Sequence, residues 1–250
     1  MSIRESSLPI VVDGLRLAGV ACVPEEPRGL VVLLHGIPSS APPDPGDEGY
    51  PGLARLFASS GWAAAWADMR GVRGSQGFFS IEGWVRDARA MVDAARAIEG
   101  TSALPVALVG SSAGGAVAVE ATKRGAPVDA LALLAAPAAW VSFANDTGAA
   151  VTRITEEAGM PLSPEVLADP GPWASEFERV VTERAITSLR IPVLVVHGTA
   201  DDVVPVDHAR RIADKARNAE LLILEGAPHQ LRRHAAAVEA TLEWLGKTLR

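Results

Sequence analysis

The chain has 250 residues, of which 48% are hydrophobic and 21% charged. These proportions are typical of globular domains and exclude disordered, collagen-like and coiled-coil chains. The formal net charge is -7 and Lys and Arg form no cluster, which argues against a nucleic-acid partner. The single cysteine, Cys22, cannot form an internal disulfide, and no Cys/His set has the spacing of a metal site.

The start of the chain carries Arg4 and Glu5 and lacks the apolar run of a signal peptide. The longest apolar stretch, residues 130–144, contains Pro137 and Ser142 and is shorter than the ~20 residues that span a bilayer. We therefore expect a soluble, cytoplasmic protein without a membrane span. The sequence leaves its oligomeric state open.

Two apolar stretches flank Asp13-Gly14 near the start and predict an antiparallel hairpin, with strands over residues 9–12 and 17–23. Beyond it, short apolar runs rich in β-branched residues alternate with segments of helical periodicity, a pattern typical of a largely parallel sheet with helices on both faces. The predicted strands are 30–34, 63–68, 106–109, 130–135, 193–196 and 220–224. The predicted helices are 52–60, 82–98, 113–124, 206–216 and 231–249.

Two segments interrupt this alternation. Residues 37–50 contain four prolines and several acidic residues, and we expect a loop there. Residues 138–190 are too long for a simple connection and carry helical patterns of their own. The sequence therefore predicts one α/β core domain formed by residues 1–137 and 191–250, with residues 138–190 inserted as a helical cap.

A serine stands in a glycine-rich turn directly after the predicted strand 106–109. The sequence Gly110-Ser111-Ser112-Ala113-Gly114 matches G-x-S-x-G and leads into a helix, which is the setting in which this motif exposes a nucleophilic serine. Small neighbours are needed because the backbone reverses sharply there. The alternative is a turn of small residues that serves close packing alone.

A serine hydroxyl needs a base, usually an imidazole, to become a nucleophile. His35 and His197 end predicted strands, whereas His208 and His234 lie in charged helical stretches, where we expect solvated surface residues. His229 lies in the loop after the last predicted strand, from which it could reach the carboxyl edge of the sheet. We therefore predict His229 as the base.

The acid that orients this histidine is expected after the strand 193–196, where Asp201 and Asp202 stand side by side. Either carboxylate could reach the site, and one of them could instead stabilise the turn or cap the following helix.

The serine, acid and histidine follow the chain order of the α/β-hydrolases. Other landmarks agree in order: His35-Gly36, Asp68-Met69-Arg70-Gly71, His197-Gly198 and Gly226-Ala227-Pro228-His229. Over nearly its whole length the chain thus resembles an α/β-hydrolase fold serine hydrolase of the esterase, lipase or serine aminopeptidase type with a small cap. The segment after Asp68 is one residue longer than the usual pattern, and we expect Asp68 and Arg70 to pair there.

The resemblance implies roles for particular residues. Asp201 would be the catalytic acid beside Ser112 and His229, with Asp202 in the turn. The backbone amides of Ile37 and Ala113 would form the oxyanion hole, and His35 would support that loop by hydrogen bonding. No cofactor is implied.

The expected reaction is hydrolysis of a small carboxylic ester through an acyl-enzyme intermediate. An amide, peptide or thioester needs the same machinery, and a lyase, a perhydrolase or a non-catalytic ligand-binding member remains an alternative. Aromatic residues of the cap either line an apolar substrate pocket or form the cap's own core. These residues are Trp140, Phe143, Trp173 and Phe177. The acidic residues Asp44, Asp47 and Glu48 are expected in a solvated loop.

Overall fold

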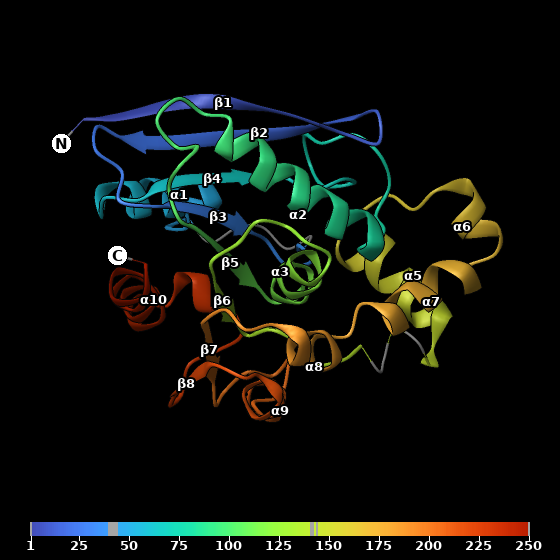
Figure 1. Ribbon diagram of the computed structural model, residues 1–250. Helices are drawn as coiled ribbons and strands as arrows, with labels where there is room; N and C mark the ends of the chain where they lie inside the picture. The colour runs from blue at the N-terminus through green and yellow to red at the C-terminus, as the bar shows by residue number, and fades with distance from the viewer. Residues whose placement is uncertain (1, 40–44, 141–142, 144, 250) are drawn as a thin grey trace.

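The computed structural model describes residues 2–39, 45–140, 143 and 145–249. Within these residues the strands form one eight-stranded sheet in the order β1-β2-β4-β3-β5-β6-β7-β8, which runs from top to bottom in Figure 1. β1 pairs antiparallel with β2 and β2 antiparallel with β4, while all other pairs are parallel. The predicted α/β class and mostly parallel sheet are confirmed. The strands are β1 (Ile3–Val12), β2 (Leu15–Pro24), β3 (Leu30–Leu34), β4 (Ala63–Ala67), β5 (Val106–Ser111), β6 (Ala130–Leu134), β7 (Val193–Gly198) and β8 (Ala219–Leu224).

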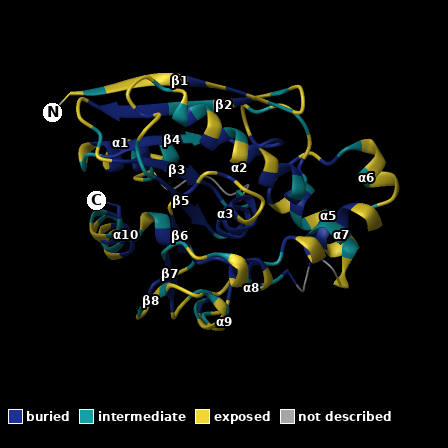
Figure 2. Cartoon of the chain, in the orientation of Figure 1, coloured by how far each residue is buried: buried dark blue, intermediate teal, exposed yellow. Residues whose placement is uncertain are grey.

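Helices cover both faces of this sheet because its central strands are apolar on both sides. Along β3, Val31 and Leu33 face one cluster of buried side chains, and the alternate residues face the other. The helices α2 (Ile81–Arg96), α3 (Ala113–Lys123) and α9 (Asp207–Lys215) pack on one face. The helices α1 (Gly49–Ser59) and α10 (Ala235–Thr248) pack on the other. Figure 2 shows the buried residues gathered on the strands between these two layers.

The helix α2 illustrates how local sequence sets these elements. Ser80 precedes it in extended conformation and its hydroxyl accepts a hydrogen bond from Gly83 N at 2.9 Å. Glu82 in the first turn and Arg96 in the last have the charges that the helix dipole favours. Its buried face includes Trp84 and Met91 and packs on the sheet.

The N-terminal hairpin is longer than predicted. Its pairing continues from the turn at Asp13-Gly14, where both residues have positive φ, as far as Ile3 opposite Pro24. The polar residues 4–7 carry no apolar alternation, and they belong to the strand because their backbone pairs with β2. Cys22 is a buried residue of β2.

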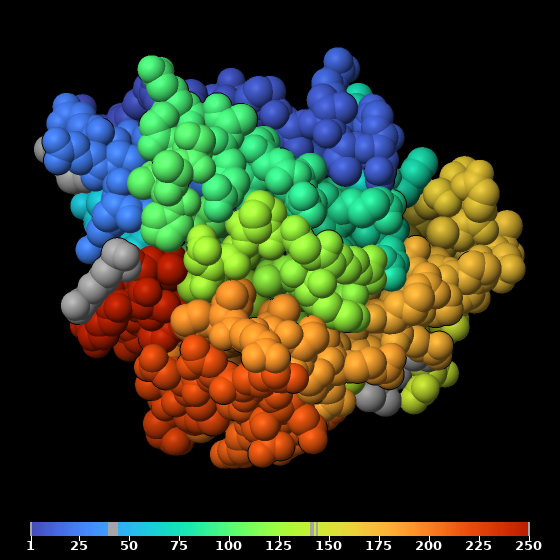
Figure 3. All heavy atoms as spheres, viewed as in Figure 1, coloured from blue at the N-terminus to red at the C-terminus, as the bar shows by residue number. Residues whose placement is uncertain are grey.

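Residues 138–190 contribute several short helices. These are α5 (Thr147–Thr152), a π-helical turn (Arg153–Glu157), α6 (Pro164–Ala168), α7 (Gly171–Arg179), α8 (Thr182–Ala185) and a 3-10 turn (Ile186–Ser188). Of these, α8 lies between α3 and α9, and α5, α6 and α7 lie to one side of the sheet, at the right of Figure 1. In the space-filling view they form a yellow-to-orange lobe against the green and teal helices (Figure 3). The division into core and cap remains a prediction. Among the helices of the described ranges, none has both the length and the apolar character to cross a bilayer.

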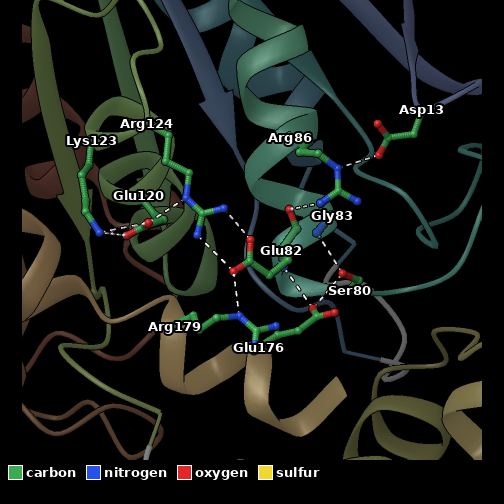
Figure 4. A network of polar contacts seen from close by, with 10 residues as sticks. All are labelled: Asp13, Ser80, Glu82, Gly83, Arg86, Glu120, Lys123, Arg124, Glu176 and Arg179. Carbon is green, nitrogen blue, oxygen red and sulfur yellow. Dashed lines mark hydrogen bonds and ion pairs between the residues drawn. The ribbon is translucent and has the colours of Figure 1, made fainter. Parts of the chain in front are cut away.

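A network of charged residues fastens α7 to the rest of the molecule (Figure 4). The Glu82 carboxylate at the start of α2 accepts hydrogen bonds from Arg124 at the end of α3 and from Arg179 on α7. Glu176 of α7 accepts from the Ser80 hydroxyl at 2.7 Å and from Glu82 N at 3.1 Å. The network therefore connects three helices from distant parts of the sequence.

Candidate active site

Ser112 lies at the sharp turn between β5 and α3. Its φ of 52° is unusual for a residue other than glycine. A Cβ atom on Gly110 would lie 2.5 Å from the Gly114 carbonyl oxygen, and one on Gly114 would collide with the carbonyl oxygens of Leu34 and His35. Both glycines are therefore required for the turn to pack, as the motif predicts, and Ser112 is held in a strained backbone conformation at the carboxyl end of the strand.

His229 and Asp201 meet this serine although they are far from it in the sequence. His229 Nε2 lies 3.0 Å from Ser112 Oγ, and its Nδ1 lies 2.8 Å from Asp201 Oδ2. The Asp201 side chain is 0% exposed and that of His229 18%. The structure thus brings together the three residues that the sequence predicted as nucleophile, base and acid, and Asp202 is exposed outside the site.

Four hydrogen-bond donors surround the Asp201 carboxylate, so both of its oxygens must act as acceptors. Oδ1 accepts the backbone N–H groups of Val203 at 3.0 Å and Val204 at 2.8 Å. Oδ2 lies between His229 and His197, whose Nε2 is 3.1 Å away. Burial by itself would raise the pKa of Asp201, but the hydrogen bonds from His197, His229 and Val204 N outweigh it and hold the pKa below its usual range. Asp201 is therefore an ionised, fully engaged carboxylate.

His197 is a site residue that the sequence analysis left without a role. It is completely buried, and its Nε2 also lies 2.8 Å from the Val204 carbonyl oxygen. Because both neighbours of Nε2 are acceptors, the ring carries its proton there and donates it. Its position at the end of a strand four residues before Asp201 is the signal that could have indicated this contact.

The loop after β3 passes directly beside the serine. A Cβ atom on Gly36 would lie 2.9 Å from Ser112 Cβ, so only glycine allows this approach. Ile37, next in this loop, and Ala113, next to the serine, thus lie on the two segments that meet at Ser112, and their role as oxyanion donors remains a prediction. His35 hydrogen-bonds the loop as expected: Nδ1 donates to Gly36 O at 2.8 Å, and Nε2 accepts from Met69 N at 2.9 Å. Burial lowers the pKa of His35.

The predicted pairing of Asp68 with Arg70 is wrong. Arg70 pairs with the buried Asp87 at 2.7 Å and with Asp13 at 2.8 Å, while Asp68 pairs with Arg73 at 2.8 Å. The Arg70 side chain lies against Gly83 of α2, where a Cβ would be 2.5 Å from its Cδ, and Asp87 follows one turn later on the same helix. Because Gly83 has no side chain, the Arg70 side chain has room to lie against α2 and reach Asp87.

The aromatic residues proposed for the substrate pocket pack against one another. Phe177 lies with its ring centroid 4.6 Å from that of Phe143, 5.2 Å from Trp173 and 5.4 Å from Trp140. All are buried, and Phe177 and Trp173 also contact Phe79, which lies just before α2. They therefore form an apolar core between α7 and the segment before α2, and a role in lining a pocket remains a prediction.

Three polar residues expected to be solvated have partners or are partly covered. His208 and His234 are half-buried, and His208 Nδ1 accepts a hydrogen bond from Ala138 N at 2.9 Å. Glu48 is exposed and pairs with Arg55, as a solvated residue would. Asp47 is instead half-buried and pairs with Arg232. Asp44 lies outside the described residues.

Comparisons with known proteins show the family of the chain. Residues 25–171, more than half of the chain, match the family model described as serine aminopeptidase, S33, and residues 172–248 match a model described as TAP-like protein. The human protein ABHD12B is 29% identical over an alignment of length 175 that covers 67% of this chain and 45% of that protein. The chain thus spans less than half the length of this curated relative.

Solved structures share the fold at low sequence identity. Est1E from Butyrivibrio proteoclasticus, solved with ferulic acid bound, is 21% identical with a TM-score of 0.73, and the match covers 96% of this chain and 98% of that one. An acylaminoacyl peptidase from Pyrococcus horikoshii is 16% identical with a TM-score of 0.73, covering 100% of this chain and 42% of the peptidase. These likenesses support the fold.

Proposed function

Because the chain belongs to the serine aminopeptidase S33 family of α/β-hydrolase fold serine hydrolases, we propose that it hydrolyses a small carboxylic ester through an acyl-enzyme on Ser112. The observation that carries the proposal is the continuous chain of hydrogen-bonding groups from Ser112 Oγ through His229 to Asp201, at 3.0 and 2.8 Å. These separations are within the hydrogen-bonding range that proton transfer requires.

In the proposed reaction Ser112 Oγ attacks the ester carbonyl carbon while its proton passes to His229 Nε2. Negative charge develops on the carbonyl oxygen, where the amides of Ala113 and Ile37 would donate hydrogen bonds; one such donor is typically worth about 10² to 10³ in rate. The carbon–oxygen bond to the alcohol then breaks, and the alcohol leaves with the proton from Nε2. Asp201 keeps the imidazole in the orientation and tautomer that these steps need.

Deacylation repeats the same steps with water. A water molecule gives one proton to His229 Nε2 and attacks the acyl carbon, and the bond to Ser112 Oγ breaks as the serine regains its proton. The carboxylic acid is released and the enzyme is restored. No other group is needed to balance the reaction.

The choice of an ester is the finer part of the proposal. The structural neighbours include Est1E with ferulic acid bound and an acylaminoacyl peptidase, so a protein that binds a carboxylic acid and a peptidase both have this fold. An amine is a poorer leaving group than an alcohol and demands more of the same residues. An ester is therefore the substrate that this triad would cleave most readily.

A panel of p-nitrophenyl esters of increasing chain length, assayed beside an aminoacyl p-nitroanilide and a thioester, tests the substrate class. Covalent labelling by a fluorophosphonate probe tests the nucleophile. We expect Ser112→Ala to lose both labelling and ester turnover, and Ser111→Ala, which removes the neighbouring hydroxyl, to keep the labelling. Turnover retained in Ser112→Ala would refute the proposal, and faster cleavage of the anilide than of every ester would replace the esterase by an amidase.

A further inference from the structure

An ion pair joins Asp47, which precedes α1, to Arg232 in the 3-10 turn Leu231–Arg233 that follows the His229 loop, 185 residues away in the sequence. Arg232 Nη1 donates to Asp47 Oδ1 at 2.8 Å and Nη2 donates to Asp47 Oδ2 at 2.5 Å. The side chains are only 21% and 11% exposed. This bidentate, mostly buried geometry distinguishes the pair from surface ion pairs, which contribute little because solvent screens them.

Asp47 is the fixed end of this connection. Its Oδ1 also accepts a hydrogen bond from Gly49 N at 2.8 Å, which attaches it to the start of α1. Tyr50 follows in the same helix; its ring lies 5.5 Å from the Arg232 guanidinium, and its hydroxyl lies 3.4 Å from the Leu34 carbonyl oxygen. Leu53 then continues the buried face of α1 on the sheet. The aspartate is therefore held on a rigid element.

The other end of the connection is the loop that carries His229. Before the histidine, the Ala227 carbonyl oxygen accepts a hydrogen bond from Ala200 N at 3.1 Å. After it, Leu231 is completely buried and Leu231 N donates to His229 O at 2.8 Å. Arg232 is the next residue, so its pairing fixes the backbone three residues beyond the imidazole.

We propose that Asp47 and Arg232 are positioning residues that hold the His229 loop at its working distance from Ser112. The inference rests on the proposed function, because it assigns the ion pair a part in that proton transfer. Asp201 restrains the imidazole ring alone, whereas the ion pair restrains the main chain from which the ring projects. A displacement of about 1 Å at such a site costs on the order of a hundredfold in rate.

The experiment compares Asp47→Asn, Arg232→Gln and the double variant with a matched pair elsewhere. Arg211 and Glu183 form a bidentate pair of similar length, at 2.7 and 2.9 Å, between α9 and α8. Glu183→Gln and Arg211→Gln therefore report what the loss of such a pair does away from the His229 loop. Each protein is measured for kcat on a p-nitrophenyl ester, amide hydrogen exchange in residues 226–234 and its global unfolding midpoint.

We expect Asp47→Asn to lower kcat about tenfold or more and the double variant to lower it no further, because Asp47 takes part in every contact of this connection. Arg232→Gln leaves Asp47 with Arg233, whose Nε lies 3.6 Å from Oδ2, and should lower kcat less. Exchange in residues 226–234 should become faster, with an unfolding midpoint close to those of the control variants. Arg232→Lys keeps the positive charge but cannot make the bidentate hydrogen bonds of a guanidinium, so its kcat should lie between those of wild type and Arg232→Gln.

Two results would overturn the inference. One is a kcat equal to that of the control variants; the other is faster exchange throughout the protein with a lower unfolding midpoint, which would make the pair a general stabiliser. A wild-type protein that neither labels on Ser112 nor turns over any ester would refute the proposed function, and this inference with it. An active wild type with unaffected variants refutes the inference alone.

Discussion

Replacing Asp201 by asparagine changes one carboxylate oxygen, an acceptor, into an NH2 group, a donor. Every group that contacts this side chain is itself a donor. Oδ1 faces two backbone N–H groups, and Oδ2 faces His229 and His197. If the amide oxygen of the new side chain faced the histidines, its NH2 group would face the backbone N–H groups of Val203 and Val204 and leave both without their acceptor. For the partly buried Val204 N–H this costs about 1–3 kcal/mol. We therefore expect the NH2 group to face His229.

The consequence falls on the tautomer of His229. Its Nδ1 must then accept a hydrogen bond, so its proton moves to Nε2, which faces Ser112 Oγ at 3.0 Å. In that form the ring has no free lone pair to take the serine proton. The equivalent substitution in a chymotrypsin-like protease costs about 10⁴ in kcat, and we expect a similar loss here. His197 keeps the Val204 carbonyl as an acceptor, so the loss of stability should stay near 1.5–3 kcal/mol, the value of one hydrogen bond to a charged group.

The assay is kcat on a p-nitrophenyl ester, with urea unfolding to verify that the variant folds. Asp202→Asn makes the same chemical change at the adjacent, exposed residue, and we expect its kcat to stay within about twofold of wild type, since surface substitutions have small effects. An Asp201→Asn protein that retained more than a tenth of the wild-type kcat, or an equal loss in Asp202→Asn, would refute this reasoning.

Three further results are expected. Asp87→Asn removes the buried one of the two carboxylates that pair with Arg70 and leaves Asp13 as its remaining ion-pair partner, so it should lower the free energy of unfolding by about 3 kcal/mol, the lower end for breaking a buried pair; a loss below 1 kcal/mol in a urea titration would contradict this. The hydrogen bond from its arginine partner lowers the pKa of Asp47 to about 2, so the pair should stabilise the fold fully above pH ~4 and progressively less towards pH 2; the stability difference between wild type and Asp47→Asn should shrink over that range, and a growing difference would contradict it. Gly198→Ala would drive a Cβ into the Ala227 carbonyl oxygen and should displace the histidine loop, lowering kcat at least tenfold, whereas unchanged kcat would show that the loop adapts.

The sequence predicted most of the sheet because its central strands are buried on both faces. Leu30–Leu34 forms a continuous apolar run of strand length, and this pattern has one simple interpretation in a parallel sheet. The outer hairpin was predicted too short because backbone pairing extends it through polar residues that show no alternation. Ser112 could be predicted because its motif is local: a strand, a turn of small residues and a helix follow one another directly.

The ion pairs were beyond this kind of prediction. Arg70 has an acidic residue two positions before it, yet it pairs with Asp87, because the choice depends on which helix crosses the loop. The pairing of Asp47 with Arg232 depends likewise on how the segment before α1 meets the turn Leu231–Arg233 from a distant part of the sequence. Local patterns show that a residue is charged, and the partner is set by tertiary packing.

Local pattern and tertiary packing also play different parts at the candidate site. The first indicates which three residues meet, and the second sets the distances between them. A parallel sheet brings the carboxyl ends of β5, β7 and β8 to one edge, which is why residues after these strands could be expected to meet. The final distances depend on places where one loop touches the backbone of another: Gly36 against Ser112, and Gly198 against Ala227. At both contacts a single methyl group would collide, so the absence of a side chain allows the loops to approach this closely. The sheet therefore selects which residues meet, and these glycine contacts set how closely they do so.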